Sequence, residues 1–388
     1  MTGSAERPAP LDMHARALSD DWRARQLEAQ QRALPHGRAV LSCPAPIDSG
    51  GLGRHLRELR EALVRAGEPH ACVCASAAAS PEGRPSAGCD LELAPSALAR
   101  VAAPLVRGSR AWRVWAGASD FDRSVARRLP AGEHLLAFNG AALAQLRAAA
   151  AGGWESRGLV SANSHFRNVV RQHARAYERH PIERPWVRHL LRRNLAEYRQ
   201  AGRVYVSSEY IYESFVREGF DESMLVRFPL TPHPRFVAAA GISDSQTFDI
   251  LFIGSLTVHK GVALLVDALA RLPQDDIRLV LIGGWGTRAM RRYLERACER
   301  DARITVAPGD PLARLQRARL CVHPAWEDGF GYAPAEALAC GVPVIASEDT
   351  GMKELIDPGR TGLVTPTGNE ATLAEAIAAA YRGELFRG

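Results

Sequence analysis

The sequence predicts an α/β protein with two doubly wound domains. Segments typical of a buried strand, a glycine-containing loop and a helix follow one another from residue 37, and the pattern restarts at residue 248. A stiff, proline-rich linker at 229–234 separates the two series. With 388 residues, 46% of them hydrophobic, the chain can bury two cores. We expect an N-terminal extension at 1–36, a first domain at 37–228 and a second domain at 229–388.

The composition limits the compartment and the partners. Seven cysteines lie mostly in apolar runs without metal-site spacing, which favours reduced core thiols in a cytoplasmic protein. No run of 18 apolar residues and no signal-peptide core occurs, so no segment is expected to cross a membrane. The net charge of +6 suits phosphorylated ligands or an anionic surface. Only two of the 49 basic residues are lysines, Lys260 and Lys353, so each lysine is informative.

The first domain opens with a strand at 39–43, a loop that contains Gly50 and Gly51, and a helix at 54–65. Such a unit places its loop at the carboxyl end of a parallel sheet, where ligands bind. A glycine pair is also common in ordinary turns, so this signal is weak alone. Further strands are expected at 71–75, 134–139, 159–162 and 225–228, and helices at 18–33, 141–151 and 210–218.

Two segments of the first domain are rich in arginine. The segment 107–128 also contains Trp112 and Trp115, a combination typical of contacts with an anionic membrane or a lipid-linked acceptor. A solvated helix face is the alternative, and the abundance of arginine in this chain favours it. The segment 167–199 is expected to be helical and broken near Pro181 and Pro185. Nucleic acid is not an expected partner, because its few aromatic residues do not alternate as a stacking platform would.

A histidine follows the expected strand at 159–162. His165 would lie at the carboxyl edge of the sheet, where its ring can form a hydrogen bond with a sugar hydroxyl. A histidine that caps a turn or packs in the core is an equally good interpretation. The residues alone leave both open.

The second domain repeats the pattern. A lysine, Lys260, precedes the first helix, where the helix dipole disfavours a cation, so a ligand-binding role is favoured over an ordinary exposed lysine. Strands are expected at 248–253, 277–282, 304–307, 320–323, 342–346 and 362–365, and helices at 261–272, 288–300, 311–317, 334–340 and 370–382.

A glycine loop joins the strands at 320–323 and 342–346. Its helix is expected to start at Pro334, and unpaired N–H groups before it would bind an anion such as phosphate. Asp328 and Glu336, which would repel phosphate, suit the hydroxyls of a sugar instead. The alternative is a loop carboxylate and a glutamate that is stabilised by the helix dipole. The backbone groups expected to contact the ligand belong to Gly331, Tyr332 and Ala333.

The second-domain motifs in combination resemble the family-4 retaining glycosyltransferases. The segment from Asp328 to Glu336 is similar to their E-x7-E signature, with aspartate in place of the first glutamate. Residues 254–261 resemble their G-R-L-x-x-x-K-G motif, with Lys260 at the lysine and Ser255 at the arginine. Either another cation, such as Arg288, compensates for the missing arginine, or the donor is bound less tightly.

The first domain shows weaker likeness to the same family. Gly50 and Gly51 resemble its glycine pair, and His165 lies in a segment similar to its SH-containing motif. The resemblance implies the GT-B fold, in which two Rossmann-like domains face each other across a cleft. Family members continue with helices that cross back to the first domain, and here the extension at 1–36 is one expected substitute.

The resemblance also implies a set of site residues. Glu336 would hold the ribose of a nucleotide diphosphate-sugar, with no metal and no cofactor. His165, Asp328 and Lys260 form the expected catalytic set. The expected donor-binding set is Gly50, Gly51, Ser255, Lys260, Gly331, Tyr332, Ala333 and Glu336.

The implied reaction is transfer of a sugar, with retention, to an acceptor hydroxyl of a polysaccharide, glycolipid or glycoconjugate. The expected acceptor is a sugar or a lipid-linked molecule, and the protein is expected in the cytoplasm or peripherally at the inner membrane face. A sugar-nucleotide epimerase of the same fold and a catalytically inactive GT-B subunit are the alternatives.

Overall fold

The computed structural model describes residues 18–76, 89–106, 109–239 and 247–386. Contacts divide the chain into two compact units. The N-terminal unit comprises Ala24–Val170 and Trp186–Leu230, and the C-terminal unit comprises Arg171–Pro185 and Thr231–Gly388 together with Met1–Arg23. These units differ from the ranges in our prediction, since most of the described extension belongs to the N-terminal unit and residues 171–185 belong to the C-terminal unit.

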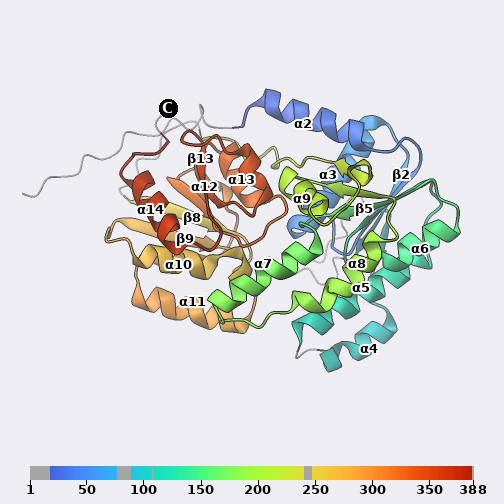
Figure 1. Cartoon of the computed structure of the whole chain (residues 1–388), viewed down its shortest axis with the longest axis horizontal. Helices are drawn as coiled ribbons and strands as arrows, with labels where there is room; N and C mark the ends of the chain where they lie inside the picture. The colour runs from blue at the N-terminus through green and yellow to red at the C-terminus, as the bar shows by residue number, and fades with distance from the viewer. Residues whose placement is uncertain (1–17, 77–88, 107–108, 240–246, 387–388) are drawn as a thin grey trace, which may run out of the picture. The chain divides into compact units, whose positions relative to one another are not determined.

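The N-terminal unit contains a seven-stranded parallel sheet in the order β3-β2-β1-β4-β5-β6-β7 (Figure 1). The order reverses between β1 and β4, since β1 pairs with β2 on one side and with β4 on the other. This reversal is the switch point at which doubly wound sheets bind ligands. The strands are β1 (Ala39–Cys43), β2 (His70–Ala75), β3 (Leu91–Leu93), β4 (His134–Phe138), β5 (Ser156–Ser161), β6 (Arg203–Val206) and β7 (Leu225–Arg227).

The helices of this unit follow the expected strand–helix alternation. The predicted break in the second basic segment is confirmed, because α7 ends before Pro181 and a 3-10 turn resumes after Pro185. The helices are α2 (Asp20–Ala33), α3 (Gly50–Ala66), α4 (Ala97–Val106), α5 (Arg110–Ala126), α6 (Leu143–Ala151), α7 (Phe166–Arg179), η2 (Val187–Leu190), α8 (Leu191–Tyr198), α9 (Glu209–Val216) and η3 (Glu222–Met224). Of these, α2 up to Arg23 and α7 from Arg171 on belong to the C-terminal unit. Apolar side chains from α5, α6, α8, α9 and the sheet form one core.

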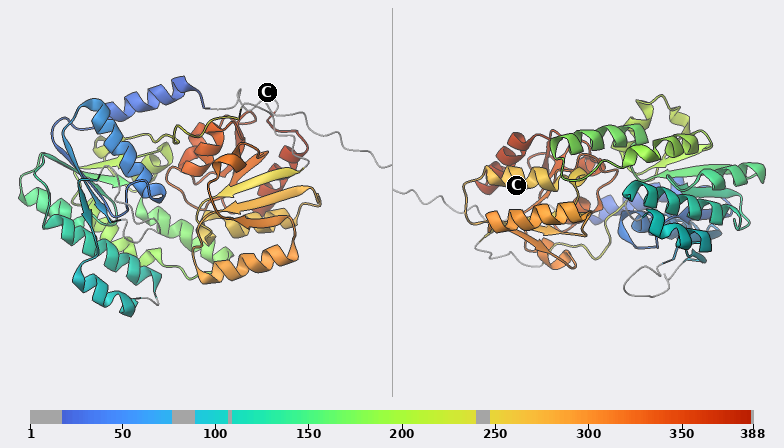
Figure 2. Two further views of the ribbon diagram at one scale, coloured as in Figure 1. Left: turned by 180° about the vertical axis from the view of Figure 1, so that it is seen from behind. Right: turned by 90° about the horizontal axis from the view of Figure 1, so that it is seen from below.

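The C-terminal unit contains a six-stranded parallel sheet in the order β10-β9-β8-β11-β12-β13. Its switch point lies between β8 and β11, and helices cover both faces of the sheet (Figure 2). The strands are β8 (Phe248–Ile253), β9 (Ile277–Ile282), β10 (Ile304–Ala307), β11 (Leu320–His323), β12 (Val344–Ser347) and β13 (Gly362–Thr365). The helices are η4 (Val258–Lys260), α10 (Val262–Ala270), α11 (Arg288–Arg300), α12 (Leu312–Leu315), α13 (Tyr332–Ala339), η5 (Gly351–Leu355) and α14 (Glu370–Tyr381).

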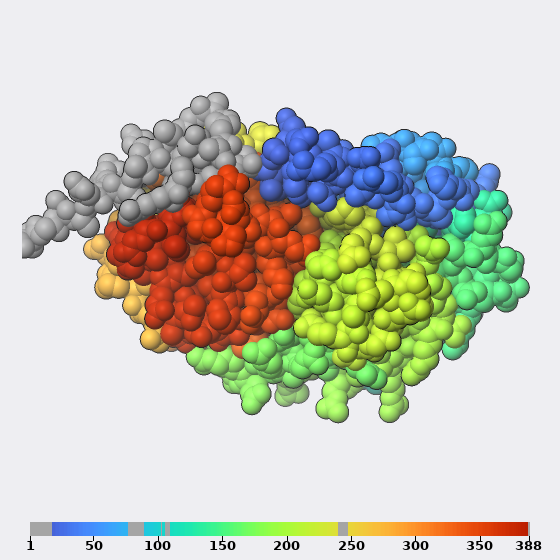
Figure 3. All heavy atoms as spheres, turned by 45° about the horizontal axis from the view of Figure 1, so that its top comes forward, coloured from blue at the N-terminus to red at the C-terminus, as the bar shows by residue number. Residues whose placement is uncertain are grey.

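The helix α2 accounts for most of the described extension and lies on the surface (blue in Figure 3). Its Gln30 side chain is fully buried, donates to Glu58 and to the carbonyl of Pro229, and accepts from Arg65. Arg23 donates to the carbonyl of Pro232. The extension is therefore fastened to the predicted linker by hydrogen bonds from two of its side chains.

The cysteines depart from expectation at one pair. The structure joins Cys74 and Cys89 in a disulfide, so the expectation that every cysteine is a reduced thiol is wrong for these two. The remaining five are free, and four of them are buried.

Candidate functional site

Two loops meet at the switch point of the C-terminal sheet. One follows β8 and ends in η4, and the other follows the neighbouring strand β11, which pairs with β8 at Leu320 and Ile250. Gly261, at the end of η4, has φ +77°, and a Cβ there would lie 1.9 Å from the carbonyl oxygen of Pro324. Only glycine permits this close approach, so it holds the Lys260 turn against the loop that leads to Asp328.

The approach brings three polar side chains together. The ammonium of Lys260 lies 2.8 Å from Oδ2 of Asp328, and Nε2 of His323 lies 2.9 Å from the same oxygen. The side chains of Lys260 and Asp328 are about one-fifth exposed, whereas that of His323 is nearly buried. Lys260 and Asp328 are thus brought together as the sequence motifs require, and both remain accessible to a ligand.

The electrostatics keep Asp328 ionised. Burial by itself would raise the pKa of this carboxyl, but the charge of Lys260 and the hydrogen bond from His323 together hold the pKa well below its usual range. Both contacts use Oδ2, and the described residues give Oδ1 no hydrogen-bond partner. Oδ1 can therefore accept a hydrogen bond from a ligand hydroxyl.

The participation of His323 is absent from our sequence prediction, which treats the residue only as the end of a strand. The position of His323 in the sequence could have predicted a role in the site, because the residue ends β11 at the ligand edge of a parallel sheet. That is the same argument that singled out His165.

The helix α13 begins two residues earlier than predicted. Tyr332 is its first residue, Gly331 is its N-cap with φ 84°, and no side chain caps it. Pro334 therefore occupies the third helical position, where it has no N–H to donate. By helix geometry the N–H group of Ala333, the second residue of the helix, has no intrahelical acceptor, which is the arrangement that anion binding requires.

Glu336 lies on the buried side of α13 and is 2% exposed. Burial, and then the charge of Glu336, raise the pKa of the thiols of Cys321 and Cys340, each to about 12. The carboxylate therefore lies beside β11 and the end of α13. Its expected contact with ribose stays a prediction.

Ser255 is exposed in the turn after β8, where the family motif has arginine. Arg288 is the first residue of α11 and is also exposed. A cation at a helix N-terminus is electrostatically unfavourable in the absence of a ligand. This position is consistent with the expectation that Arg288 compensates for the missing arginine.

The segment 171–185 contacts the Lys260 turn and stabilises it. These contacts are absent from our sequence prediction. Glu183, which is 6% exposed, accepts a hydrogen bond of 2.8 Å from the backbone N–H of Val258 at the start of η4. Thr257, the N-cap of η4, makes no side-chain capping bond. The ring of His173 stacks on that of His259 at 4.3 Å. Glu183 thus acts as the cap of the turn that carries Lys260.

In the N-terminal unit, Gly50 and Gly51 form the first turn of α3 rather than a loop before it, so the predicted helix start at residue 54 is wrong. Gly50 has φ +59°, which allows the chain to enter the helix directly after β1 and its short turn. Both glycines are exposed, and a Cβ on either would meet nothing within 4 Å. There is room for a ligand beside this backbone.

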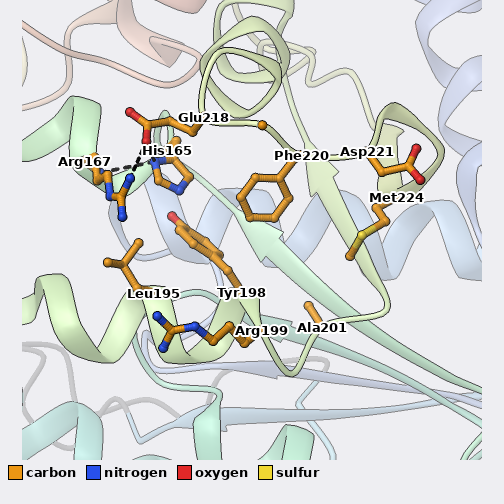
Figure 4. A pocket seen from close by; sticks show the side chains of 11 residues that line it. His165, Arg167, Leu195, Tyr198, Arg199, Ala201, Glu218, Phe220, Asp221 and Met224 are labelled. Carbon is orange, nitrogen blue, oxygen red and sulfur yellow. Dashed lines mark hydrogen bonds and ion pairs between the residues drawn. The ribbon is translucent and has the colours of Figure 1, made fainter.

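His165 lies within the N-terminal unit in an aromatic environment (Figure 4). It is 2% exposed, its ring packs against Tyr198, Phe215 and Phe220, and Nδ1 lies 3.9 Å from Glu218. This environment fits the packing interpretation better than a sugar contact. The residue forms part of the wall of a cavity of about 500 Å³, lined also by Arg167, Leu195, Tyr198, Arg199, Ala201, Glu218, Gly219, Phe220, Asp221 and Met224.

Two structural features are absent from the described ranges 18–76, 89–106, 109–239 and 247–386. No three His, Cys, Asp or Glu side chains in them are grouped as metal ligands. No helix in them is long and apolar enough to cross a membrane.

Residues 238–387 match the family described as glycosyl transferases group 1. A relative, the D-inositol 3-phosphate glycosyltransferase of Pseudarthrobacter chlorophenolicus, is 34% identical over 148 residues. The alignment covers 36% of this chain and 35% of the relative, so the chain spans about a third of the relative's length.

Solved structures resemble most of the chain. Sucrose-phosphate synthase from Thermosynechococcus elongatus has a TM-score of 0.60 at 20% identity and covers 91% of this chain and 92% of its own. Anabaena HepE, in a crystal structure in complex with UDP-glucose, has a TM-score of 0.58 at 16% identity and covers 90% and 93%. At these identities the likeness concerns the fold. The chain therefore has the GT-B fold of two parallel-sheet α/β domains, and its residues 238–387 are similar to the glycosyl transferases group 1.

Proposed function

We propose that the protein is a retaining glycosyltransferase that moves a sugar from a nucleotide diphosphate-sugar to an acceptor hydroxyl without a metal ion. The observation that carries this proposal is the contact between Lys260 and Asp328. It brings a phosphate-binding cation and a sugar-binding carboxylate together at the switch point of the C-terminal sheet.

In the proposed reaction the bond between the anomeric carbon and the diphosphate oxygen breaks. The acceptor oxygen bonds to the same face of that carbon, and its proton passes to the departing diphosphate, so the configuration is retained. Negative charge grows on the diphosphate in the transition state. Lys260 and the first N–H groups of α13 are suited to stabilise this charge, which is the dominant catalytic need when no metal takes part.

The remaining contacts orient the donor. Oδ1 of Asp328 accepts a hydrogen bond from a hydroxyl of the donor sugar, and Glu336 accepts from the ribose. The hydroxyl of Ser255 donates to the diphosphate, with Arg288 as the additional cation. In the N-terminal unit, the exposed backbone of Gly50 and Gly51 is a further proposed donor-binding segment. HepE, which shares the fold, was crystallised in complex with UDP-glucose, and this supports a donor of that class.

The proposed acceptor belongs to a surface polysaccharide, glycolipid or glycoconjugate, and the proposal includes peripheral contact with an anionic membrane. Support for this contact comes from α5, on which Trp112 and Trp115 are exposed and Arg113 lies between them. Tryptophan and arginine on one helix surface suit the interface between lipid headgroups and acyl chains.

A two-step experiment tests the proposal. A thermal-shift screen against UDP-, GDP- and ADP-sugars identifies the donor, because a ligand that binds the folded state raises Tm. Release of the nucleoside diphosphate from that donor is then followed in the wild type and in Lys260→Met and Lys353→Met. Lys353 is the matched control, since it is the other lysine of the chain and donates a hydrogen bond to the carbonyl of Glu348.

We expect release in the wild type and in Lys353→Met and its loss in Lys260→Met. No release from any of these donors, with binding intact, would favour the inactive-subunit alternative. Recovery of an epimerised sugar would favour the epimerase alternative.

A further inference from the structure

A second cavity of the N-terminal unit lies at the ends of its first three strands. We name it the strand-end pocket. Its volume is about 600 Å³, within the range of small-molecule sites. The lining residues are Pro44, Leu52, Ala75, Ser76, Leu93, Ala94, Pro95, Ala99, Arg113, Val114, Gly117, Ala118, Asp120, Phe121 and Ser124.

The origin of these residues places the pocket at the ligand edge of the sheet. Pro44 follows β1, Ser76 follows β2 and Ala94 follows β3, so three parallel strands present their carboxyl ends to it. Leu52 belongs to the first turn of α3, directly after Gly51. The pocket is therefore next to the exposed glycine backbone at the switch point.

The walls of the strand-end pocket are mostly apolar, and its charged groups differ in availability. Asp120 is already engaged, because its carboxylate accepts hydrogen bonds from both the backbone N–H and the hydroxyl of Ser96. Arg113 is exposed, and no described residue forms an ion pair with it. A ligand would thus meet hydrocarbon walls and one guanidinium that is free to bind an anion.

The apolar surface continues outward from the pocket. A neighbouring cavity of about 490 Å³ between α4 and α5 shares Pro95, Ala99, Arg113, Gly117 and Asp120 with it. Beyond these cavities, Leu98 is 76% exposed and Trp112 is 57% exposed. Of the eight exposed large hydrophobic residues in the described part of the chain, five lie on α4 and α5: Leu98, Val101, Trp112, Val114 and Trp115. Exposed apolar side chains that gather on two neighbouring helices suit a binding surface.

We propose that the strand-end pocket binds the hydrocarbon part of the acceptor, an amphiphile that carries an anionic group beside its chain. Arg113 binds the anionic group, and the chain lies against the walls formed by α4 and α5 and leaves along their exposed apolar side chains. The hydroxyl end then lies at the carboxyl edge of the sheet. This inference rests on the proposed function, because it names the acceptor class of that reaction.

The test uses dodecyl phosphate, below its micellar concentration, as the probe and the full chain as the protein. Calorimetry measures its binding to the wild type, to Ala99→Phe and Ala118→Leu, which fill the pocket, and to Arg113→Gln. Ala97→Phe is the matched control, because Ala97 lies on the same helix as Ala99 and lines neither cavity. Inorganic phosphate and dodecyl maltoside separate the contributions of charge and chain.

We expect at least tenfold weaker binding of dodecyl phosphate to both filled variants and to Arg113→Gln, with no change in Ala97→Phe. Inorganic phosphate alone should bind far more weakly than dodecyl phosphate, and dodecyl maltoside should bind in the wild type and in Arg113→Gln alike. Equal affinity for dodecyl phosphate in the wild type and both filled variants would overturn the inference, as would unchanged affinity in Arg113→Gln.

Donor binding separates this test from that of the proposed function. The filled variants should keep the wild-type thermal shift with the donor nucleotide-sugar, which also confirms that they fold. Intact donor binding with no binding of dodecyl phosphate contradicts the acceptor inference alone. Binding of dodecyl phosphate without any donor binding contradicts the proposed function instead.

Discussion

The two switch points of this protein present different chemical groups to a ligand. That of the C-terminal sheet carries charged side chains, Lys260, Asp328 and His323, which converge within hydrogen-bond distance. That of the N-terminal sheet presents the bare backbone of Gly50 and Gly51 beside apolar walls. The C-terminal site thus depends on the chemical identity of a few charged side chains. The N-terminal site depends on exposed backbone and on the shape of an apolar cavity.

This difference has a functional consequence. Charges that are held in place before the ligand arrives stabilise a developing charge, so the C-terminal site should control the rate. An apolar pocket contributes through burial of hydrocarbon, which is non-directional, so the N-terminal site should control the choice and affinity of the acceptor. The following predictions test this division of roles between the two sites.

The largest effect is expected for Lys260→Met. Loss of a preorganised cation at the departing diphosphate should lower kcat by about 10²–10³-fold. Steady-state kinetics with the donor found in the thermal-shift screen measure the change, and Lys353→Met should behave as the wild type. A rate in Lys260→Met within threefold of that of the wild type would contradict the claim that the charged C-terminal site controls the rate.

Asp328→Asn should lower kcat/KM about 10–100-fold, because a charge-assisted hydrogen bond contributes roughly 1.5–3 kcal/mol. Asparagine cannot neutralise Lys260, and it weakens the bond to His323. Asp328→Glu, which restores the residue of the family signature, should retain most of the activity. Equal losses in both variants would show that the carboxylate charge is not what the site needs.

His55 offers a test of the apolar half through stability. Burial lowers the pKa of this histidine to about 3, no described residue forms a hydrogen bond with either ring nitrogen, and the ring lies against Phe138 and Phe228. The unfolded chain binds the proton below about pH 6.5 and the folded chain does not. Acidification from pH 6.5 should therefore lower the free energy of unfolding by about 1.4 kcal/mol per pH unit for this group.

Urea unfolding between pH 7 and pH 5 measures that slope. His55→Leu removes the group, so the difference in stability between variant and wild type should grow as the pH falls. Parallel profiles of the two proteins would mean that the environment of His55 is not apolar.

The smallest effect is expected for Glu183→Ala. Loss of a helix cap costs about 1 kcal/mol, which corresponds to a roughly fivefold rise in the donor KM, with kcat little changed, because Glu183 positions the Lys260 turn and does not contact the ligand. Glu183→Gln, which keeps an acceptor for the Val258 N–H, should recover most of the affinity. Glu178→Gln on the exposed side of α7 is the control. A fall in kcat without a change in KM would contradict a positioning role.

The contrast between the units also explains what the sequence reveals. The strands β8, β9 and β10 have the predicted bounds, because each is a mostly apolar run that glycine or polar residues bound. The strand β3 was not predicted, since three residues are too few to show a period. Lys260 and Asp328 were predicted because they are rare or distinctive in their setting.

Other features depend on contacts between distant parts of the chain. Glu183 accepts a hydrogen bond from the N–H of Val258, which lies 75 residues away in the sequence. Neither local sequence contains a pattern that predicts this contact. The strand-end pocket exists only because α5 packs beside three strand ends, and each lining residue alone resembles an ordinary core residue. The sequence indicates the glycine pair but not its position inside α3. Glycine permits several backbone conformations, so its presence does not determine which one the chain adopts.

Calorimetric titration of the nucleoside diphosphate of the preferred donor into the wild type, Lys260→Met and Lys353→Met measures how much of the affinity for the diphosphate depends on Lys260. We expect Lys260→Met to bind at least tenfold more weakly and Lys353→Met to bind as the wild type does. Equal affinity in all three proteins would contradict the claim that the Lys260 turn, placed against Asp328, holds the diphosphate.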